Sequence, residues 1–306
     1  MSTRDWFKFI ALSLIWGTSF LWIKIAVTEV GPFILVVFRT LFAALTILTF
    51  LLYRRIKMPR ARSWWWRFIF VGFFNVALPF VLISWSEEYV SSGMASLMNC
   101  TMPLWTAILA TIFLADEPLT WNKGAGLLVG FGGVVLLISN QINGGVKGVE
   151  ISLGMLLVAA ISYAISSVFI RRNIQGIPAE TQSLGQMGTA FLMILPVAAL
   201  ADPPLRFPHL ALTWLALLWL GILGSGVATI LSYSLLNSVG STRTSLTSYV
   251  YTLIAVLLGA VFLNEPLNWQ LIVGGVMIIA GVMWVNYGTL WWQWLGSRLT
   301  QQDLSR

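Results

Sequence analysis

The chain carries very little charge for its length. Asp, Glu, Lys and Arg make up only 9% of its 306 residues, whereas they make up about 25% of a typical soluble domain. Hydrophobic residues, by contrast, account for 58%. Because so few polar side chains cannot cover a soluble fold of this size, the composition excludes a soluble protein and indicates an integral membrane protein.

Residues that carry most enzyme and metal chemistry are almost absent. The single cysteine, Cys100, cannot form an internal disulfide, and the single histidine, His209, falls in an expected loop. No H-E-x-x-H pattern occurs, no pair of aspartates is expected inside the membrane, and the glycine-rich stretch 124–133 lacks the GK[ST] of a phosphate-binding loop. The sequence therefore predicts no enzyme, no bound cofactor and no metal site.

Long polar segments are also missing, so no separate soluble domain is expected. A helix that spans a bilayer needs about 20 mainly apolar residues. Ten such stretches follow one another, with short breaks that carry turn or charge signals, at 7–27, 32–53, 66–86, 90–115, 121–139, 151–170, 182–201, 212–236, 241–263 and 269–287. We predict ten transmembrane helices in a multi-pass protein.

Positive charge is distributed unevenly over these breaks. Lys and Arg are concentrated in every second connection, for example in RRIKMPRAR at 54–62. Because cytoplasmic connections are enriched in Lys and Arg, this bias predicts that both termini are cytoplasmic. The net charge of +7 is therefore explained by basic connections that face the lipid bilayer, and no nucleic-acid partner is expected. We expect the cytoplasmic (inner) membrane of a bacterium as the location.

One short motif occurs twice. LADEPLTW at 114–121 and FLNEPLNW at 262–269 match at an offset of 148 positions, which aligns Glu117 with Glu265. The helices that follow keep the same register, because the offset also aligns Gly126 with Gly274 and Gly133 with Gly281. The common offset predicts an internal repeat with halves at 1–143 and 144–290, followed by a cytoplasmic tail at 291–306.

Each half holds five predicted spans, so the second half must enter the membrane from the opposite side. The predicted fold is therefore an all-α integral membrane protein of ten helices in two inverted five-helix repeats, an arrangement typical of alternating-access transporters. The repeated glutamate is expected near the positive end of the helix that follows it, with Thr120 and Asn268 as N-caps.

Several longer stretches resemble one known family. They are IWGTSFLWIK at 15–24, FRTLFAAL at 38–45, the segment 91–137 and its second-half copy, which ends NEPLNWQLIVGGVMIIAGV at 264–282. Through them nearly the whole chain resembles EamA-type members of the drug/metabolite transporter superfamily. The resemblance implies ten helices, a central cavity between the halves, and export of small metabolites, amino acids or drugs.

One charged residue is expected deep in the membrane. Arg39 lies seven residues after Pro32, which places it about 10 Å into its span, where a lone charge costs about 3 kcal/mol. Two interpretations stay open: a structural arginine that bonds helix-end carbonyls or snorkels outward, and a ligand for a substrate carboxylate. Lys24 lies nearer a span end, where snorkelling is expected.

Neutral polar and aromatic residues at mid-span are the other candidates for substrate binding. Such a residue must find a partner, which a wet cavity can supply, although helix–helix hydrogen bonding explains any single one equally well. Two prolines are included because they free backbone carbonyls near the midplane. With Arg39, the predicted substrate-binding residues are Trp16, Ser19, Asn75, Pro79, Asn99, Pro103, Tyr163, Ser167, Tyr233, Thr247 and Tyr251.

This set of residues suits a small neutral or zwitterionic solute. We therefore predict a secondary transporter of amino acids or similar metabolites, with export implied by the resemblance. The alternatives are an exporter of drugs, organic cations or nucleosides, and a non-transporting membrane sensor or assembly protein. All eleven acids fall at span ends or in breaks, which disfavours proton antiport through a buried carboxylate. A monomer is expected to suffice, and a dimer through glycine-rich helix faces stays open.

Overall fold

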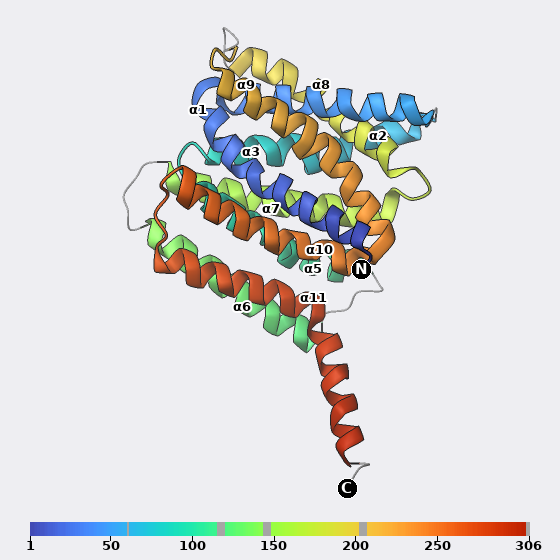
Figure 1. Ribbon diagram of the computed structural model, residues 1–306, viewed down its shortest axis with the longest axis vertical. Helices are drawn as coiled ribbons and strands as arrows, with labels where there is room; N and C mark the ends of the chain where they lie inside the picture. The colour runs from blue at the N-terminus through green and yellow to red at the C-terminus, as the bar shows by residue number, and fades with distance from the viewer. Residues whose placement is uncertain (60, 115–119, 143–147, 202–206, 304–306) are drawn as a thin grey trace.

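The computed structural model describes residues 1–59, 61–114, 120–142, 148–201 and 207–303. Within these residues every regular element is a helix, which confirms the predicted all-α class. In chain order the elements are α1 (Thr3–Arg54), α2 (Ser63–Gly72), η1 (Phe73–Ala77), α3 (Leu78–Ser86), α4 (Ser92–Asn99), α5 (Met102–Phe113), α6 (Trp121–Ile142), α7 (Val149–Asn173), α8 (Ala179–Ala201), α9 (Ala211–Leu218), η2 (Trp219–Val227), α10 (Ala228–Phe262) and α11 (Trp269–Asp303). Figure 1 shows one bundle, from which the end of α11 projects.

Two of these helices are divided by a glycine in the left-handed region of backbone space. Gly31 in α1 has φ 74° and Gly240 in α10 has φ 82°, values that glycine adopts without a steric penalty. Pro32 follows Gly31 and fits the first turn of the next segment. Figure 1 shows α1 turning back on itself at one end of the bundle. Both α1 and α10 therefore consist of two helical segments, in agreement with the predicted breaks.

The described helices have the dimensions of membrane spans. Eight of them are long and apolar enough to cross a bilayer, and Leu246–Phe262 forms a shorter apolar helix. The 52 residues of α1 would measure about 78 Å as one straight helix, more than twice the thickness of the hydrocarbon core. The reversal at Gly31 removes this excess. The chain is thus a multi-pass membrane protein.

The third predicted span of each half contains a π-helical segment. In η1, Leu78 donates its N–H to the carbonyl of Phe73, one residue further back than in an α-helix. The cause is Pro79, which cannot donate to Asn75 and whose ring crowds that carbonyl. The repeat offset of 148 maps η1 into η2, where no proline occurs and the segment GILGSG at 221–226 replaces it. The π-helical segment thus occurs with a proline in the first half and with small residues in the second half.

A second proline breaks the fourth predicted span. Pro103 stands four residues after Asn99, so the hydrogen bond that would continue α4 past Asn99 is lost. The helix ends there, and α5 begins at Met102 with Pro103 in its first turn. In between, the Met98 carbonyl accepts from both the Thr101 hydroxyl at 2.6 Å and the Thr101 N–H at 3.1 Å.

Glycines bring α6 and α11 into backbone contact. A Cβ on Gly281 would lie 2.6 Å from the carbonyl oxygen of Gly126, and one on Gly133 would lie 2.6 Å from that of Gly274. Rising residue numbers in α6 therefore meet falling numbers in α11, so the two helices run antiparallel. They lie side by side at one edge of the bundle (Figure 1). The glycine faces of α6 and α11 thus pack against each other within this chain.

Helices of the two predicted halves alternate in the interior. The second segment of α1 packs against α9 and η2, and α8 packs in the same manner against α2 and η1. The Thr189 hydroxyl of α8 donates to the Phe68 carbonyl of α2 at 2.9 Å. A Cβ on Gly221 of η2 would lie 2.5 Å from the Cβ of Phe42 on α1. Neither predicted half closes its own core, so side chains of both face the same interior.

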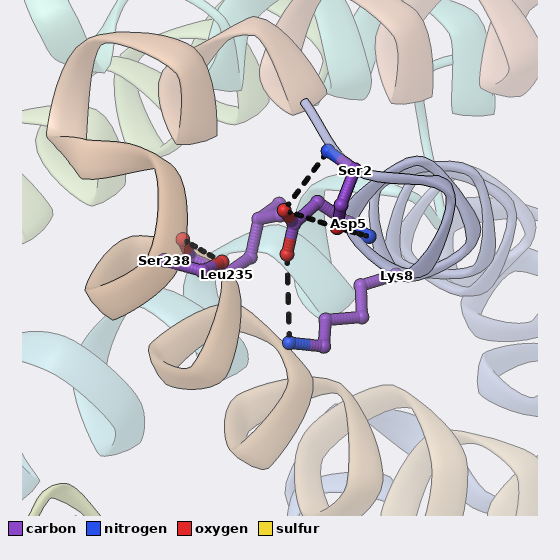
Figure 2. A network of polar contacts seen from close by, with 5 residues as sticks. All are labelled: Ser2, Asp5, Lys8, Leu235 and Ser238. Atoms are coloured by element: carbon purple, nitrogen blue, oxygen red, sulfur yellow. Dashed lines mark hydrogen bonds and ion pairs between the residues drawn. The ribbon is translucent and has the colours of Figure 1, made fainter.

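The N-terminal turn of α1 is fixed by a capping box, drawn in Figure 2. The Asp5 N–H donates to the Ser2 hydroxyl at 3.2 Å, and the Asp5 carboxylate accepts from the Ser2 N–H at 3.2 Å and from the Ser2 hydroxyl at 2.7 Å. Lys8 pairs with Asp5 at 3.7 Å. Ser238 of α10 lies beside the same carboxylate. This network holds the start of α1 against the end of the first segment of α10.

The repeated Glu motif is positioned differently from its prediction. Thr120 accepts from the Lys123 N–H at 3.3 Å, which confirms it as an N-cap. Glu265, however, accepts hydrogen bonds from the N–H of Ser92 (2.7 Å) and of Gly93 (3.2 Å), at the start of α4 rather than α11. The reason is Asn264, whose φ of 53° turns Glu265 back along α10.

Two further predictions concern the ends of the repeat. The first-half counterpart of Glu265, Glu117, lies outside the described residues. The segment 291–306, predicted as a separate tail, is helical as far as Asp303 and continues α11 without a break in the helix. The boundary expected at residue 290 therefore does not coincide with the end of a helix.

Candidate functional site

Three of the predicted residues meet around the hydroxyl of Tyr251. Asn99, where α4 is broken, donates its side-chain N–H to the Tyr251 hydroxyl of α10 at 3.1 Å. The Trp16 ring of α1 meets the Tyr251 ring edge-on, with 6.0 Å between centroids, and its indole N–H donates to the Gly224 carbonyl in η2 at 3.1 Å. The Phe20 ring of α1 also stacks on the Tyr251 ring, with 6.2 Å between centroids. The group draws on both predicted halves.

Asn99 carries an acceptor that the described residues leave unused. Its side-chain oxygen is buried and has no hydrogen-bond partner among the described residues. A buried polar atom without a partner is costly, so a native site with such an atom calls for an explanation. The oxygen can accept from an ammonium, hydroxyl or amide of a solute.

Arg39 forms the second part of the site. Its side chain is 7% exposed, its Nε donates to the Ser225 hydroxyl in η2 at 2.9 Å, and its guanidinium lies 3.8 Å from the centre of the Phe80 ring. No carboxylate of the described residues lies within 4.0 Å of its nitrogens. The structural interpretation expected Arg39 to bond helix-end carbonyls or to snorkel outward. The described contacts of Arg39 show neither. An aromatic face and a hydroxyl hold the cation inside the bundle.

Tyr163 connects these two parts. It lies on α7, within electrostatic range of both Arg39 and Tyr251. Trp16, Asn99, Tyr163 and Tyr251 are all only half-buried, although they contact helices of both predicted halves. Polar and aromatic side chains that converge in an interior and keep accessible surface are typical of a small-molecule site. We call Trp16, Arg39, Asn99, Tyr163 and Tyr251 the central group.

Other predicted residues use their polar atoms between helices or locally. Asn75 in η1 donates to the Gln186 side chain of α8 at 3.1 Å, and the Tyr233 hydroxyl lies beside Ser183 of α8. The Ser19 hydroxyl donates to the Ile15 carbonyl at 2.9 Å, and the Thr247 hydroxyl donates to the Thr244 carbonyl at 2.7 Å. The contacts of Asn75 and Tyr233 thus join helices, as the structural alternative expects, whereas the bonds of Ser19 and Thr247 stay within their own helices.

Of the remaining three predicted residues, two are prolines that change the backbone, and the third is Ser167. Pro79 and Pro103 cause the π-helical segment and the broken span described above. The freed carbonyl of Phe74 in η1 accepts from the Ser162 hydroxyl of α7 at 2.7 Å, so one such carbonyl is satisfied by protein. Ser167 is half-buried one turn beyond Tyr163.

Sequence reasoning missed the partners of the central group. Ser225 and Gly224 lie in η2, Phe80 follows Pro79, and each looks like an ordinary residue of an apolar span. For η2, the cluster of glycine and serine in GILGSG at 221–226 was an available signal, because helix distortions often occur at such residues. Nothing in the sequence distinguishes Phe80 from the other phenylalanines.

The prediction that no acid is buried is wrong for Glu87. Its side chain has no exposed surface, and both carboxyl oxygens lack a hydrogen-bond partner among the described residues. The prediction for Lys24 is also wrong, because its ammonium donates inward to the backbone carbonyls of Glu87 and Val90. The pattern SEEY at 86–89 offered a clue. Of these two adjacent acids, Glu88 is exposed and Glu87 is buried.

These features define a class before any comparison. An all-helical bundle of membrane-length helices, with a half-buried polar group between its predicted halves, has the architecture expected of a membrane transport protein. The chain belongs to the EamA-like transporter family, whose family model matches residues 6–139 and again residues 151–287. The resemblance seen in the sequence is thereby confirmed, and the chain is a membrane transporter.

Relatives agree with this assignment over nearly the whole chain. The chain is 26% identical over 278 residues to "Uncharacterized inner membrane transporter YedA" of Escherichia coli K12, with 89% of this chain and 88% of the relative covered. It is 26% identical over 287 residues to an "Uncharacterized transporter" of Archaeoglobus fulgidus, with 90% and 97% covered. A solved crystal structure superimposes with a TM-score of 0.67 at 20% identity, covering 93% of this chain and 98% of that one, which shows a shared fold.

Proposed function

We propose that the chain is a secondary transporter that works by alternating access and carries small zwitterionic or neutral metabolites, with amino acids as the leading class. It crosses the inner membrane of a bacterium ten times, as two inverted five-helix repeats at 1–143 and 144–290 with both termini in the cytoplasm. It acts as a monomer and exports its substrate, the direction that the resemblance implies.

The antiparallel packing of α6 and α11 supports the inverted repeat. Equivalent helices of inverted repeats must cross the membrane in opposite directions. The offset of 148 exchanges the two close contacts, Gly126 with Gly281 and Gly133 with Gly274, as a pseudo-two-fold axis between the helices requires. The matching positions of η1 and η2 and the two matches of the family model point the same way.

Arg39 carries the proposal for the substrate. A buried guanidinium without a carboxylate partner among the described residues lacks the counter-charge that such a site normally contains. A substrate carboxylate supplies it through charge-assisted hydrogen bonds. The unused side-chain oxygen of Asn99 is suited to accept from the ammonium of the same solute. Tyr163 interacts electrostatically with Arg39, Tyr251 interacts with Tyr163 and Asn99, and both tyrosines carry hydroxyls that can bond a polar solute.

Counterflow in proteoliposomes tests this function. Vesicles are preloaded with one neutral amino acid, its decarboxylated amine or a nucleoside, and exchange of the labelled form is measured without an ion gradient. We expect saturable exchange of the amino acid alone. Arg39→Gln should lower that exchange by about 10- to 100-fold, because a hydrogen bond to a charged group contributes about 1.5–3 kcal/mol. Arg172→Gln, at an exposed position, should leave it unchanged.

The same panel decides between the alternatives. Exchange of the amine in preference to the amino acid would replace the proposal with an organic-cation carrier, and exchange of the nucleoside would replace it with a nucleoside carrier. If folded Arg39→Gln protein exchanges the amino acid as fast as the wild type, Arg39 is structural and does not bind the carboxylate. Silence for every solute, with folded protein, would contradict a transporter of these classes.

A further inference from the structure

The surroundings of Glu87 favour a neutral carboxyl. An ionised carboxylate that is removed from water and accepts no hydrogen bond is far more costly than the protonated acid. Burial accordingly raises the pKa of Glu87 well above its ordinary value. The nearby ammonium of Lys24 opposes this shift, the carboxylate of Glu265 adds to it, and the more weakly coupled Arg39 opposes it.

Charged groups approach this carboxyl from several elements. Lys24 and Arg39 come from the two segments of α1, and Glu265 comes from the connection between α10 and α11. The two other acids nearby, Glu88 in the same turn and Glu150 at the start of α7, are exposed. Ser86, next to Glu87, donates its hydroxyl to the Ser152 carbonyl of α7 at 3.0 Å. The turn that holds Glu87 is therefore enclosed by both predicted halves.

Hydrogen bonds join the two predicted halves at this turn. Glu265 fixes the start of α4 to the second half through the N–H groups of Ser92 and Gly93, and Ser86 bonds the carbonyl of Ser152 on α7. Lys24 fixes the same turn to α1 of its own half through the Val90 carbonyl. Alternating access requires the halves to separate at one end of the bundle in one of its states. Separation at this end would admit water to Glu87, and a hydrated carboxyl returns to an ordinary pKa.

We propose that Glu87 is a proton-binding site that couples transport to the proton gradient. The carboxyl holds a proton while this end of the bundle is closed and releases it to water when the end opens, and no other bond is made or broken. This proposal rests on the alternating-access function proposed above. Because the closed state binds the proton more tightly, the proton stabilises closure at low pH, and this stabilisation is lost as the pH rises through the raised pKa of Glu87.

The experiment combines a transport assay with a direct proton measurement. Labelled leucine is followed in proteoliposomes, first by counterflow without a gradient and then by accumulation driven by a pH gradient. Glu87→Gln is compared with Glu88→Gln, a matched change at the exposed neighbour. Infrared titration of the same purified proteins records the C=O band of a protonated carboxyl at neutral pH, and this measurement needs no solute.

We expect Glu87→Gln to keep counterflow and to lose gradient-driven accumulation, while Glu88→Gln keeps both. One coupled proton supports about a tenfold concentration ratio per unit of pH gradient, and Glu87→Gln should reduce that ratio to one. The protonated-carboxyl band should occur in the wild type and disappear in Glu87→Gln. If Glu87→Gln does not fold, Glu87→Leu replaces it, because an apolar side chain leaves no buried polar atom without a partner.

Two results would overturn the proposal. One is gradient-driven accumulation in Glu87→Gln that equals the wild type, and the other is a band that is absent from the wild type at neutral pH or persists in the variant. If the wild type exchanges no solute of the panel, the proposed transport function fails, and the infrared titration still decides whether Glu87 binds the proton. Failure of the transport function and failure of the proton site are thus distinguishable.

Discussion

The two predicted halves build their fourth span in different ways. In the first half the span is broken, because α4 ends at Asn99 and α5 begins at Met102, just before Pro103. In the second half, α10 continues from Gly240 to Phe262 without a break, and Tyr251 stands where the offset of 148 places Pro103. One half thus contributes a backbone break, and the other contributes a continuous helix with an aromatic hydroxyl.

This difference lies at the central group. The broken end and the continuous helix meet in the hydrogen bond from Asn99 to Tyr251. A perfectly symmetric pair of halves would present the same group twice, whereas an amino acid has unlike ends. One Pro-to-Tyr difference between equivalent positions therefore makes the central group asymmetric, as the proposed amino-acid substrate would require. The closely packed glycines of α6 and α11, by contrast, keep the symmetric pattern.

The largest effect should come from making the second half like the first. Tyr251→Pro removes the N–H that helix geometry bonds to the carbonyl of residue 247, and a proline inside a helix costs about 3 kcal/mol or more. We expect most of the Tyr251→Pro protein to be unfolded already at temperatures at which the wild type is still folded. Cys100, the single cysteine and fully buried, reports unfolding through its reaction with a fluorescent maleimide during heating.

Tyr251→Phe is the control for this change, since it removes the hydroxyl and keeps the helix. It should unfold close to the wild-type temperature. If Tyr251→Pro also unfolds close to the wild-type temperature, α10 tolerates a break at this position. The contrast between the two spans then has no structural importance.

A smaller loss of stability is expected from a change at the glycine contact between α6 and α11, where the two predicted halves are alike. Gly281→Ala adds a methyl group 2.4 Å from the Gly130 nitrogen and 2.6 Å from the Gly126 oxygen, which are backbone atoms that cannot rotate away. Overpacking of this kind costs about 1–3 kcal/mol, so the maleimide reaction of Cys100 should begin at a lower temperature. Transport should fall in proportion to the folded fraction.

Gly154→Ala on α7 is the matched control, because no atom lies within 4 Å of the added methyl group. It should leave the unfolding temperature unchanged or raise it slightly, since alanine favours a helix over glycine. Equal destabilisation by both changes would mean that the loss of glycine itself, and not the contact between α6 and α11, determines stability.

Much of this fold could be predicted from the sequence, because its causes are local. Apolar runs of membrane length, the glycines at positions 31 and 240 and the prolines at 79 and 103 each act on the backbone within one turn. All five residues of the central group were singled out in the sequence for a similar reason, since each is a polar, charged or aromatic residue in an apolar span. The partner chosen by each side chain depends on how distant helices meet, which no local pattern encodes.

The errors have a common physical cause. Glu265, Lys24 and Glu87 were all placed by their distance from a span end, as though each helix end faced water. In the structure, one helix end packs against another element, so Glu265 binds the start of α4 and Lys24 binds carbonyls of the turn between α3 and α4. Glu87 is enclosed by the same contacts. Long-range packing thus determined the environment of these charged residues.

A moderate effect is expected from repairing the break in the first half. Pro103→Ala restores an N–H that can donate to the Asn99 carbonyl, so α4 and α5 can join into one helix. We expect slower maleimide labelling of Cys100 in the native protein, because this residue lies at the break. Transport should slow as well if the break serves as a hinge. Unchanged labelling with unchanged transport would show that Pro103 has no role beyond its local geometry.

The smallest effect should come from the hydrogen bond that joins the two spans. A neutral hydrogen bond contributes about 0.5–1.5 kcal/mol, so Asn99→Ala and Tyr251→Phe should each lower stability modestly. Combined in one protein, they should lower it by less than the sum, with a coupling energy of about 1 kcal/mol measured from the unfolding of the four proteins. Asn75→Ala combined with Tyr251→Phe should be additive, because Asn75 bonds Gln186 instead. Additivity in the first pair would mean that Asn99 and Tyr251 act independently and that the two unlike spans are not coupled through this bond.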